Sequence, residues 1–263
     1  MWLRDWTRRP RAEARLLCLP SAGGSASAFR GWAAGLPAWL GVVAVELPGH
    51  GARMGQRPVS SAGELFSGGL VDEVRALSDR PLILFGHSLG GRIALGLAAA
   101  LARAGAAAPL LLVVAACECP APAAPIRDRG RDPDLDDAAV RAFLRRQGGT
   151  DPQVLADPEL MGLLLPAVRA DLRLAFDLDR EPAEPLPAPV HVYLGDDDRS
   201  VPRESALGWA EYSGPGFALR SFPGGHFFVR ESEDEVLLAL DADIRRATGH
   251  TAWTDDHRSG RRG

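Results

Sequence analysis

Residues 86–91 read Gly-His-Ser-Leu-Gly-Gly and lie between an apolar run and a helix-like stretch. The run before them, 81–85, has the composition of a buried strand, and residues 92–100 are typical of a helix. A strand, a sharp turn and a helix around Gly-x-Ser-x-Gly describe a nucleophile elbow, in which a strained turn exposes the serine. The helix that follows directs the positive end of its dipole toward the place where an anion would form. The segment therefore predicts that Ser88 is a nucleophile.

A serine nucleophile needs a general base, and one of the six histidines fits that role best. His226 lies in the sequence Pro-Gly-Gly-His-Phe-Phe, on a glycine-rich loop after the strand-like run 217–222, and it follows the serine in the chain. His50 also follows a strand-like run, but it precedes the serine, which is the wrong order for this kind of site. His87 lies inside the elbow itself. His226 is therefore the predicted base.

The acid that orients the base should lie between the serine and the histidine in the chain. Three consecutive aspartates follow the strand-like run 189–194. Asp198 is favoured because its Gly-x-x-Asp-x-x-Val spacing turns a carboxylate back across the sheet edge. Asp196 and Asp197 are better explained as solvated or backbone-capping side chains. Glu118, just after an earlier strand-like run, is the weaker alternative.

An oxyanion hole needs two backbone N–H groups. The first is expected from Leu89, the residue after the nucleophile. The second should come from the loop after the first core strand, where residues 19–24 read Leu-Pro-Ser-Ala-Gly-Gly. Ala22 is the best candidate there, with Gly23 close behind, because the glycines allow the backbone to approach a substrate carbonyl. This set of residues requires no metal and no other cofactor.

The alternation of strand-like and helical segments predicts an α/β fold with a mostly parallel sheet covered on both faces. The interval 120–188 breaks the alternation, and we interpret it as a helical lid inserted before the strand that carries the acid. Its helical pieces are expected at 138–146 and 159–176, with a kink at Pro166. The strand-like runs lie at 15–19, 42–47, 81–85, 110–116, 189–194 and 217–222. We expect one domain over 1–247 and a disordered tail over 248–263.

Composition excludes several classes of protein. The chain has 263 residues, a net charge of −4 and three cysteines. This charge does not favour a nucleic-acid partner, and an odd number of cysteines does not suggest a disulfide framework. The first residues lack an apolar signal core, and no apolar run approaches the ~18 residues of a membrane span. We therefore expect a cytoplasmic protein that is not bound to a membrane.

Motifs spread over most of residues 15–240 resemble the type II thioesterases that accompany modular polyketide and nonribosomal peptide synthetases. Two positions depart from the family's usual pattern, because Ser21 stands where the family has histidine and His50 where it has arginine. Both lie beside the predicted site, where they would affect substrate preference more than chemistry. The segments that carry the resemblance are 19–27 with Trp32, 45–53, 85–91, 148–150, 165–166 with 169–171, and 222–228.

The resemblance implies an α/β-hydrolase fold and a thioester hydrolase with Ser88, Asp198 and His226 as its catalytic triad. The implied partner is a phosphopantetheinylated acyl or peptidyl carrier protein, bound transiently. Hydrolysis would remove stalled or aberrant acyl units from a synthetase of secondary metabolism, such as antibiotic biosynthesis. Because such carriers are mostly acidic, the arginines near the lid hinge are candidate contacts, although a solvated charged loop explains them equally well; they are Arg127, Arg129 and Arg131.

Two alternative functions use the same three residues, since the acceptor of the acyl group is chosen by water access and pocket shape. One is an esterase for small esters, and the other is an acyltransferase that releases a product. A non-catalytic carrier-binding protein is less favoured, because the chain keeps all three residues of the predicted triad.

Overall fold

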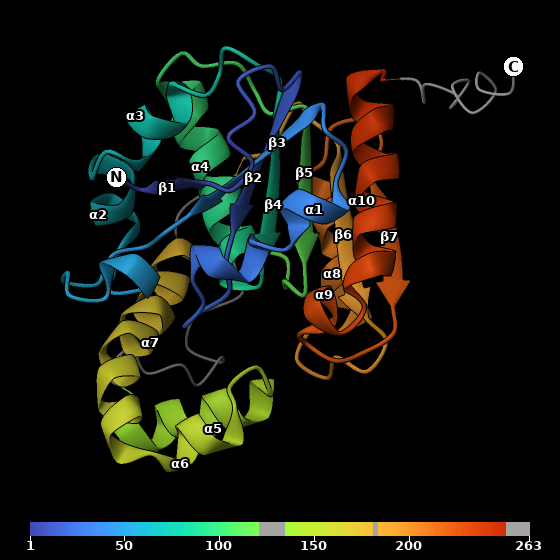
Figure 1. The fold of residues 1–263 in the computed structure, drawn as a ribbon. Coiled ribbons are helices and arrows are strands. Elements are labelled where there is room, and N and C mark those ends of the chain that lie inside the picture. Colours follow the sequence, from blue (N-terminus) through green and yellow to red (C-terminus); the bar gives the residue numbers. More distant parts are fainter. Residues whose placement is uncertain (121–134, 181–183, 251–263) are drawn as a thin grey trace, which may run out of the picture.

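A seven-stranded sheet forms the centre of the molecule in the computed structural model, which describes residues 1–120, 135–180 and 184–250 (Figure 1). The strand order is β1-β3-β2-β4-β5-β6-β7, and all neighbouring strands are parallel except β1 and β3. The strands are β1 Leu3–Asp5, β2 Ala14–Leu19, β3 Leu40–Val45, β4 Leu82–His87, β5 Leu111–Ala115, β6 Val190–Gly195 and β7 Ala218–Phe222. The predicted mostly parallel α/β architecture is confirmed.

Helices cover both faces of this sheet because its strands are apolar on both sides. In β2, Leu17 and Leu19 face one core, whereas Leu16 and Cys18 face the other. Helices α2, α3, α4 and α7 contribute to the first core, and α1, α9 and α10 to the second. Among the described residues, the α-helices outside the insert are α1 Trp32–Gly35, α2 Ala62–Ser67, α3 Leu70–Arg75, α4 Leu89–Arg103, α8 Arg203–Leu207, α9 Phe228–Glu231 and α10 Glu233–Thr248.

Among the described residues between β5 and β6, three helices lie at the end of the sheet to which the parallel strands point (Figure 1). They are α5 Asp137–Gln147, α6 Pro152–Ala156 and α7 Pro158–Leu178, and we call this segment the insert. Pro166 lies inside α7, which continues past it as one helix, as the expected helix over 159–176 required. The insert has a small apolar core of its own, formed by Val140, Leu144, Met161, Leu165 and Val168.

The C-terminal boundary differs from the expectation. Helix α10 includes Thr248, Gly249 ends it in the left-handed conformation with φ 67°, and the His250 ring stacks on Trp39 at 4.2 Å. The expected start of a disordered tail at 248 therefore falls within a helix, whose C-cap and aromatic contact the sequence pattern did not indicate. Residues 251–263 and the three arginines of the expected lid hinge lie outside the described residues. Within the described ranges, no helix is long and apolar enough to cross a membrane.

A buried carboxylate fixes α10 to the sheet. Asp243 is 0% exposed, and it accepts hydrogen bonds from Tyr193 Oη at 2.7 Å and Arg220 Nε at 3.0 Å. His191 Nδ1 lies 2.8 Å from the same carboxylate. Burial raises the pKa of Asp243, but the hydrogen bonds from these three side chains outweigh it and hold that pKa well below its usual value. The carboxylate is therefore ionised in the folded protein.

Replacing Asp243 with alanine should destabilise the fold by about 3–5 kcal/mol, because it leaves buried cationic and polar partners without an acceptor. Urea denaturation followed by circular dichroism measures the change. Asp241→Ala is the matched control, since Asp241 pairs with Arg245 one turn along the same helix at a partly exposed site, and its loss should cost less than about 1 kcal/mol. Equal effects of the two substitutions would contradict the structural role of Asp243.

Candidate active site

Ser88 occupies a strained turn between β4 and α4. Its backbone has φ 54° and ψ −117°, in the left-handed half of conformational space that residues with a side chain rarely adopt. Glycines on both sides make the turn feasible, because a Cβ at Gly86 would lie 2.3 Å from the Gly90 carbonyl oxygen. A Cβ at Gly90 would lie 2.1 Å from the Leu19 carbonyl oxygen. The predicted strand–turn–helix context is present, and it places the serine at the N-terminus of a 15-residue helix.

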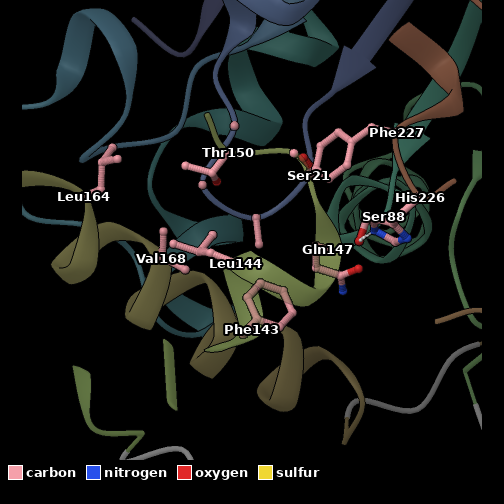
Figure 2. A pocket seen from close by; sticks show the side chains of 14 residues that line it. Ser21, Ser88, Phe143, Leu144, Gln147, Thr150, Leu164, Val168, His226 and Phe227 are labelled. Carbon is pink, nitrogen blue, oxygen red and sulfur yellow. Dashed lines mark hydrogen bonds between the residues drawn. The ribbon is translucent and has the colours of Figure 1, made fainter. Parts of the chain in front are cut away.

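Three predicted site residues form a continuous run of hydrogen bonds. His226 Nε2 lies 3.0 Å from Ser88 Oγ (Figure 2). Its Nδ1 lies 2.8 Å from Asp198 Oδ2. Because Nδ1 faces a carboxylate, the proton of the neutral ring belongs on Nδ1, which leaves Nε2 as the acceptor for the serine proton. Burial raises the pKa of Asp198, but hydrogen bonds from His226 and Ser200 hold it below its usual value. The arrangement has the geometry of a nucleophile, a base and an orienting acid.

The other candidate acids do not occupy the position beside His226 that Asp198 takes. Asp196 and Asp197 are exposed, and their backbone amides bond to the carbonyls of Phe222 and Gly224, as expected of turn residues. The carboxylate that meets the histidine ring belongs to Asp198 and not to Glu118, which follows β5. The structure thus places Asp198, the acid that the Gly-x-x-Asp spacing favoured, beside the His226 ring.

Two other histidines lie nearby without joining this run. His87 is buried inside the elbow, and its Nε2 lies 2.8 Å from the carbonyl oxygen of His226. Burial lowers the pKa of His87 to about 3, so the ring is neutral at physiological pH and can donate Nε2–H to that carbonyl. His50 contacts Asp171 of α7 instead. His87 therefore supports the backbone of the loop that carries His226.

Sequence reasoning missed Ser200. Its Oγ donates to Asp198 Oδ1 at 2.6 Å, and its backbone N–H donates to the same oxygen at 2.8 Å. Its Oγ also lies 2.9 Å from His226 Nδ1. The pattern Asp-x-Ser could have indicated it, because an aspartate side chain commonly accepts hydrogen bonds from the residue two positions on. Ser200 fixes the carboxylate that faces the histidine ring.

Ser200→Ala should lower kcat by about tenfold, because one charge-assisted hydrogen bond to the Asp198 carboxylate is lost while the backbone bond remains. The loss also removes one of the contacts that lower the pKa of Asp198. Ser200→Thr keeps the hydroxyl and should recover most of the rate. A kcat equal to that of the wild type in the alanine variant, measured under saturating substrate, would show that the hydroxyl has no positioning role.

The two residues expected to supply the oxyanion hole differ in how the structure supports them. Leu89 is the first residue of α4, where backbone amides have no partner within the helix. On the other side, the amide of Gly23 donates to Asp171 Oδ2 at 2.7 Å and is already occupied. Ala22 lines the pocket, and its amide donates no hydrogen bond to any described residue. These contacts favour Ala22 over Gly23 as the second donor.

A pocket opens beside Ser88 and His226, and the insert forms one of its walls (Figure 2). A Cβ at Gly149 would lie 2.0 Å from the Phe227 ring, so the loop after α5 meets the residue next to His226 very closely. The loop after β2 and the aromatic ring of Phe227 complete the lining. The lining residues from the insert are Phe143, Leu144, Gln147, Gly149, Thr150, Leu164 and Val168.

The apolar residues in the first half of α7 divide into three groups. Leu164 lines the pocket, whereas Met161 and Leu165 are buried in the insert's own core. Leu160 is 43% exposed and Leu163 is 59% exposed. Most of this stretch therefore packs within the insert or faces solvent.

Comparisons with known proteins agree with this geometry. A family model described as a thioesterase domain matches residues 14–244. The chain is 36% identical over 91% of its length to the AMB antimetabolite synthetase AmbE of Pseudomonas aeruginosa, but it spans only 11% of that protein. It is 33% identical to the thioesterase PikA5 of Streptomyces venezuelae, covering 90% of this chain and 83% of PikA5. The solved structure of the type II thioesterase BorB from the borrelidin biosynthetic cluster is similar with a TM-score of 0.80 and 36% identity, covering 93% of this chain and 98% of BorB.

Proposed function

Because this chain belongs to the thioesterase family, we propose that it hydrolyses acyl groups from the phosphopantetheine arms of carrier proteins. The observation that carries the proposal is the run of hydrogen bonds from Ser88 through His226 to Asp198 beside a pocket. An activated serine at the N-terminus of a helix is suited to acyl transfer, in which a carbonyl oxygen becomes an anion.

The reaction begins when Ser88 Oγ attacks the thioester carbonyl carbon and His226 Nε2 takes the serine proton. The carbonyl oxygen becomes an oxyanion, which the N–H groups of Ala22 and Leu89 stabilise. Collapse of the tetrahedral intermediate breaks the carbon–sulfur bond, and His226 returns the proton to the departing thiolate. Asp198 holds the imidazole in the required tautomer throughout the step.

Water completes the cycle. His226 takes a proton from a water molecule that attacks the acyl-serine ester, and a second tetrahedral intermediate forms in the same oxyanion hole. When it collapses, the proton passes to Ser88 Oγ, and the acyl group leaves as a carboxylic acid. The reaction needs no cofactor, because the serine, the histidine and water supply every proton and nucleophile.

The biological role that we propose is the removal of stalled or aberrant acyl units from a polyketide or nonribosomal peptide synthetase. BorB, a type II thioesterase from a biosynthetic cluster, matches this chain over nearly its whole length. A segment of AmbE, a synthetase, also matches it. The pocket beside Ser88, with one wall supplied by the insert, is where the arm would bring its acyl group.

The proposal predicts that an acyl-carrier protein is a better substrate than the same acyl group on cysteamine. Contacts remote from the reacting carbonyl can orient it, so truncating the substrate should lower kcat as well as apparent affinity. We expect kcat/KM to be at least about tenfold higher for the carrier-bound substrate. The measurement follows released acid by mass spectrometry, with Ser88→Ala as the background. Equal kcat/KM values for the two substrates would show that the carrier protein is not recognised and that the enzyme hydrolyses small thioesters in general.

A further inference from the structure

A second buried histidine–aspartate pair lies beside the proposed site. His50 Nε2 lies 2.9 Å from Asp171 Oδ2, and the two residues are 5% and 1% exposed. His50 follows β3, whereas Asp171 belongs to α7 of the insert. The mechanism proposed above uses neither residue. A buried ionisable pair without a role in the reaction requires another explanation.

The surroundings of the His50 ring indicate that it carries a positive charge. Its Nδ1 lies 3.1 Å from the Pro48 carbonyl oxygen, and its Nε2 faces the Asp171 carboxylate. Both partners are acceptors, so both ring nitrogens must carry a proton to satisfy them. The charged groups that act on the ring are Asp171 from α7 and Glu46 from the end of its own strand. Burial lowers the pKa of His50, but the hydrogen bond and charge of Asp171 outweigh burial and leave the pKa raised.

The same carboxylate oxygen holds the loop after β2. Asp171 Oδ2 accepts the Gly23 N–H at 2.7 Å, and Gly23 is the residue next to the proposed oxyanion donor Ala22. Gly23 has φ 73°, a conformation that favours glycine, and a Cβ there would lie 3.1 Å from the Val168 side chain of α7. The loop therefore lies tightly against the insert where Asp171 fixes it.

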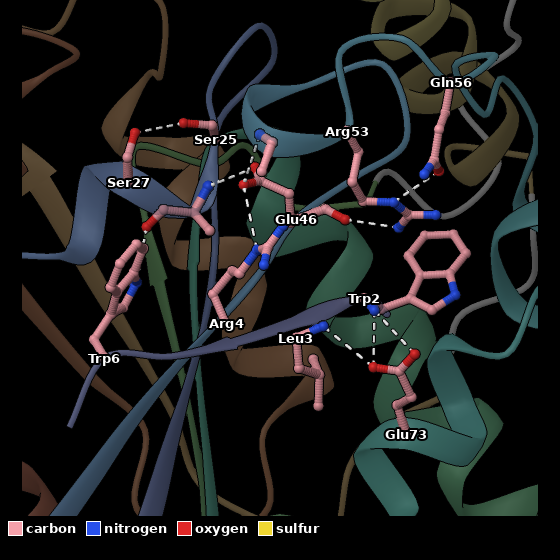
Figure 3. A network of polar contacts seen from close by, with 12 residues as sticks. Trp2, Leu3, Arg4, Trp6, Ser25, Ser27, Glu46, Arg53, Gln56 and Glu73 are labelled. Atoms are coloured by element: carbon pink, nitrogen blue, oxygen red, sulfur yellow. Dashed lines mark hydrogen bonds and ion pairs between the residues drawn. The ribbon is translucent and has the colours of Figure 1, made fainter. Parts of the chain in front are cut away.

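A second carboxylate fixes the other end of this loop. Glu46 is 4% exposed, and its Oε1 accepts the Ala26 N–H at 3.0 Å (Figure 3). Its Oε2 accepts the Ala52 N–H at 3.3 Å and lies 4.0 Å from Arg4 Nε. The segment from Gly23 to Ala26 is thus held at its two ends by buried acids. Asp171 has a titratable histidine as its partner, whereas Glu46 is held by backbone amides and an arginine.

We propose that Asp171, held in place by the imidazolium form of His50, is a positioning residue that keeps the Ala22 amide directed at the oxyanion. The inference rests on the proposed function, because it concerns the oxyanion hole of that reaction. When His50 loses its proton, either Asp171 or the Pro48 carbonyl loses a donor. Asp171 is then less firmly placed, and the loop that carries Ala22 loosens. The effect falls on kcat, since the oxyanion exists in the transition state and not in the bound substrate.

The direction with pH follows from the raised pKa of His50. A group whose pKa is raised on folding contributes stability below its unfolded pKa, and this contribution is lost as pH rises through the folded pKa. The positioning should therefore weaken on the alkaline side.

The test measures kcat and KM against pH for one acyl-cysteamine thioester. The variants are His50→Gln, which keeps an amide donor for Asp171 but does not titrate, and Asp171→Asn. We expect both to lower kcat by about tenfold at neutral pH, with KM changed by less than about twofold. We expect the alkaline decline of the wild type to be absent in His50→Gln. His191→Gln is the matched control, because His191 of β6 contacts Asp243 of α10 in another buried pair, and its kcat should not change.

A readout independent of activity is ¹⁵N NMR of histidine-labelled protein, in which Asp171→Asn should lower the pKa of His50. An alkaline decline retained in His50→Gln, or an unchanged kcat in both variants, would overturn the inference. A loss of activity that matches the loss of folded protein, followed by circular dichroism at the assay temperature, would overturn it too. If the wild type does not hydrolyse the thioester, the proposed function fails, and the NMR titration still reports whether the pair exists.

Discussion

Ser88→Ala should lower kcat for thioester hydrolysis by about 10⁶-fold, because it removes the nucleophile of a triad whose three members act together. The fold should remain intact, because the Ser88 hydroxyl bonds to His226 and contributes little to packing. Stopped-flow or mass-spectrometric rates, with thermal denaturation as a check on folding, give the comparison. Ser21→Ala is the matched control, as it makes the same chemical change in the lining of the same pocket and should stay within about tenfold. Activity of Ser88→Ala within tenfold of the wild type would exclude the serine mechanism.

Asp198→Asn should lower kcat by about 10⁴-fold, because an amide facing Nδ1 favours the wrong imidazole tautomer. The variant replaces a single carboxylate oxygen with an amide nitrogen, so it tests the tautomer of the His226 ring and leaves the packing around residue 198 nearly unchanged. Asp196→Asn and Asp197→Asn are matched controls in the same loop and should change kcat only slightly, since both side chains are exposed. Rates under saturating acyl-cysteamine distinguish the three. If Glu118→Gln were the crippling substitution instead, the assignment of the acid would be wrong.

The parts of the site that could be predicted from sequence are those whose geometry is local. Gly86 and Gly90 flank the serine because a Cβ at either position would meet backbone within 2.3 Å, so the motif itself carries the structure. The core strands were predictable because continuous apolar runs indicate burial on both faces. β1 was not, because it has three residues, half-exposed and without an apolar run.

The contacts that sequence reasoning missed depend on how distant segments meet. His50 and Asp171 are 121 positions apart, and they meet because α7 returns across the sheet edge. The position of α7 also determines which backbone amide of the loop after β2 is available to an oxyanion. Asp171 accepts the Gly23 N–H, whereas the Ala22 N–H donates to no described residue. Packing of the insert, which no single motif describes, determines each of these features.

The most direct test of the central claim is intact-protein mass spectrometry of an acyl-carrier protein incubated with the wild type. The account predicts that the carrier loses the mass of the acyl group alone and keeps its phosphopantetheine arm, while free acid accumulates. Ser88→Ala should leave the acyl-carrier unchanged over the same period. Loss of the whole arm, transfer of the acyl group to another acceptor without release of acid, or equal activity of Ser88→Ala would contradict the claim that Ser88 hydrolyses carrier-bound thioesters.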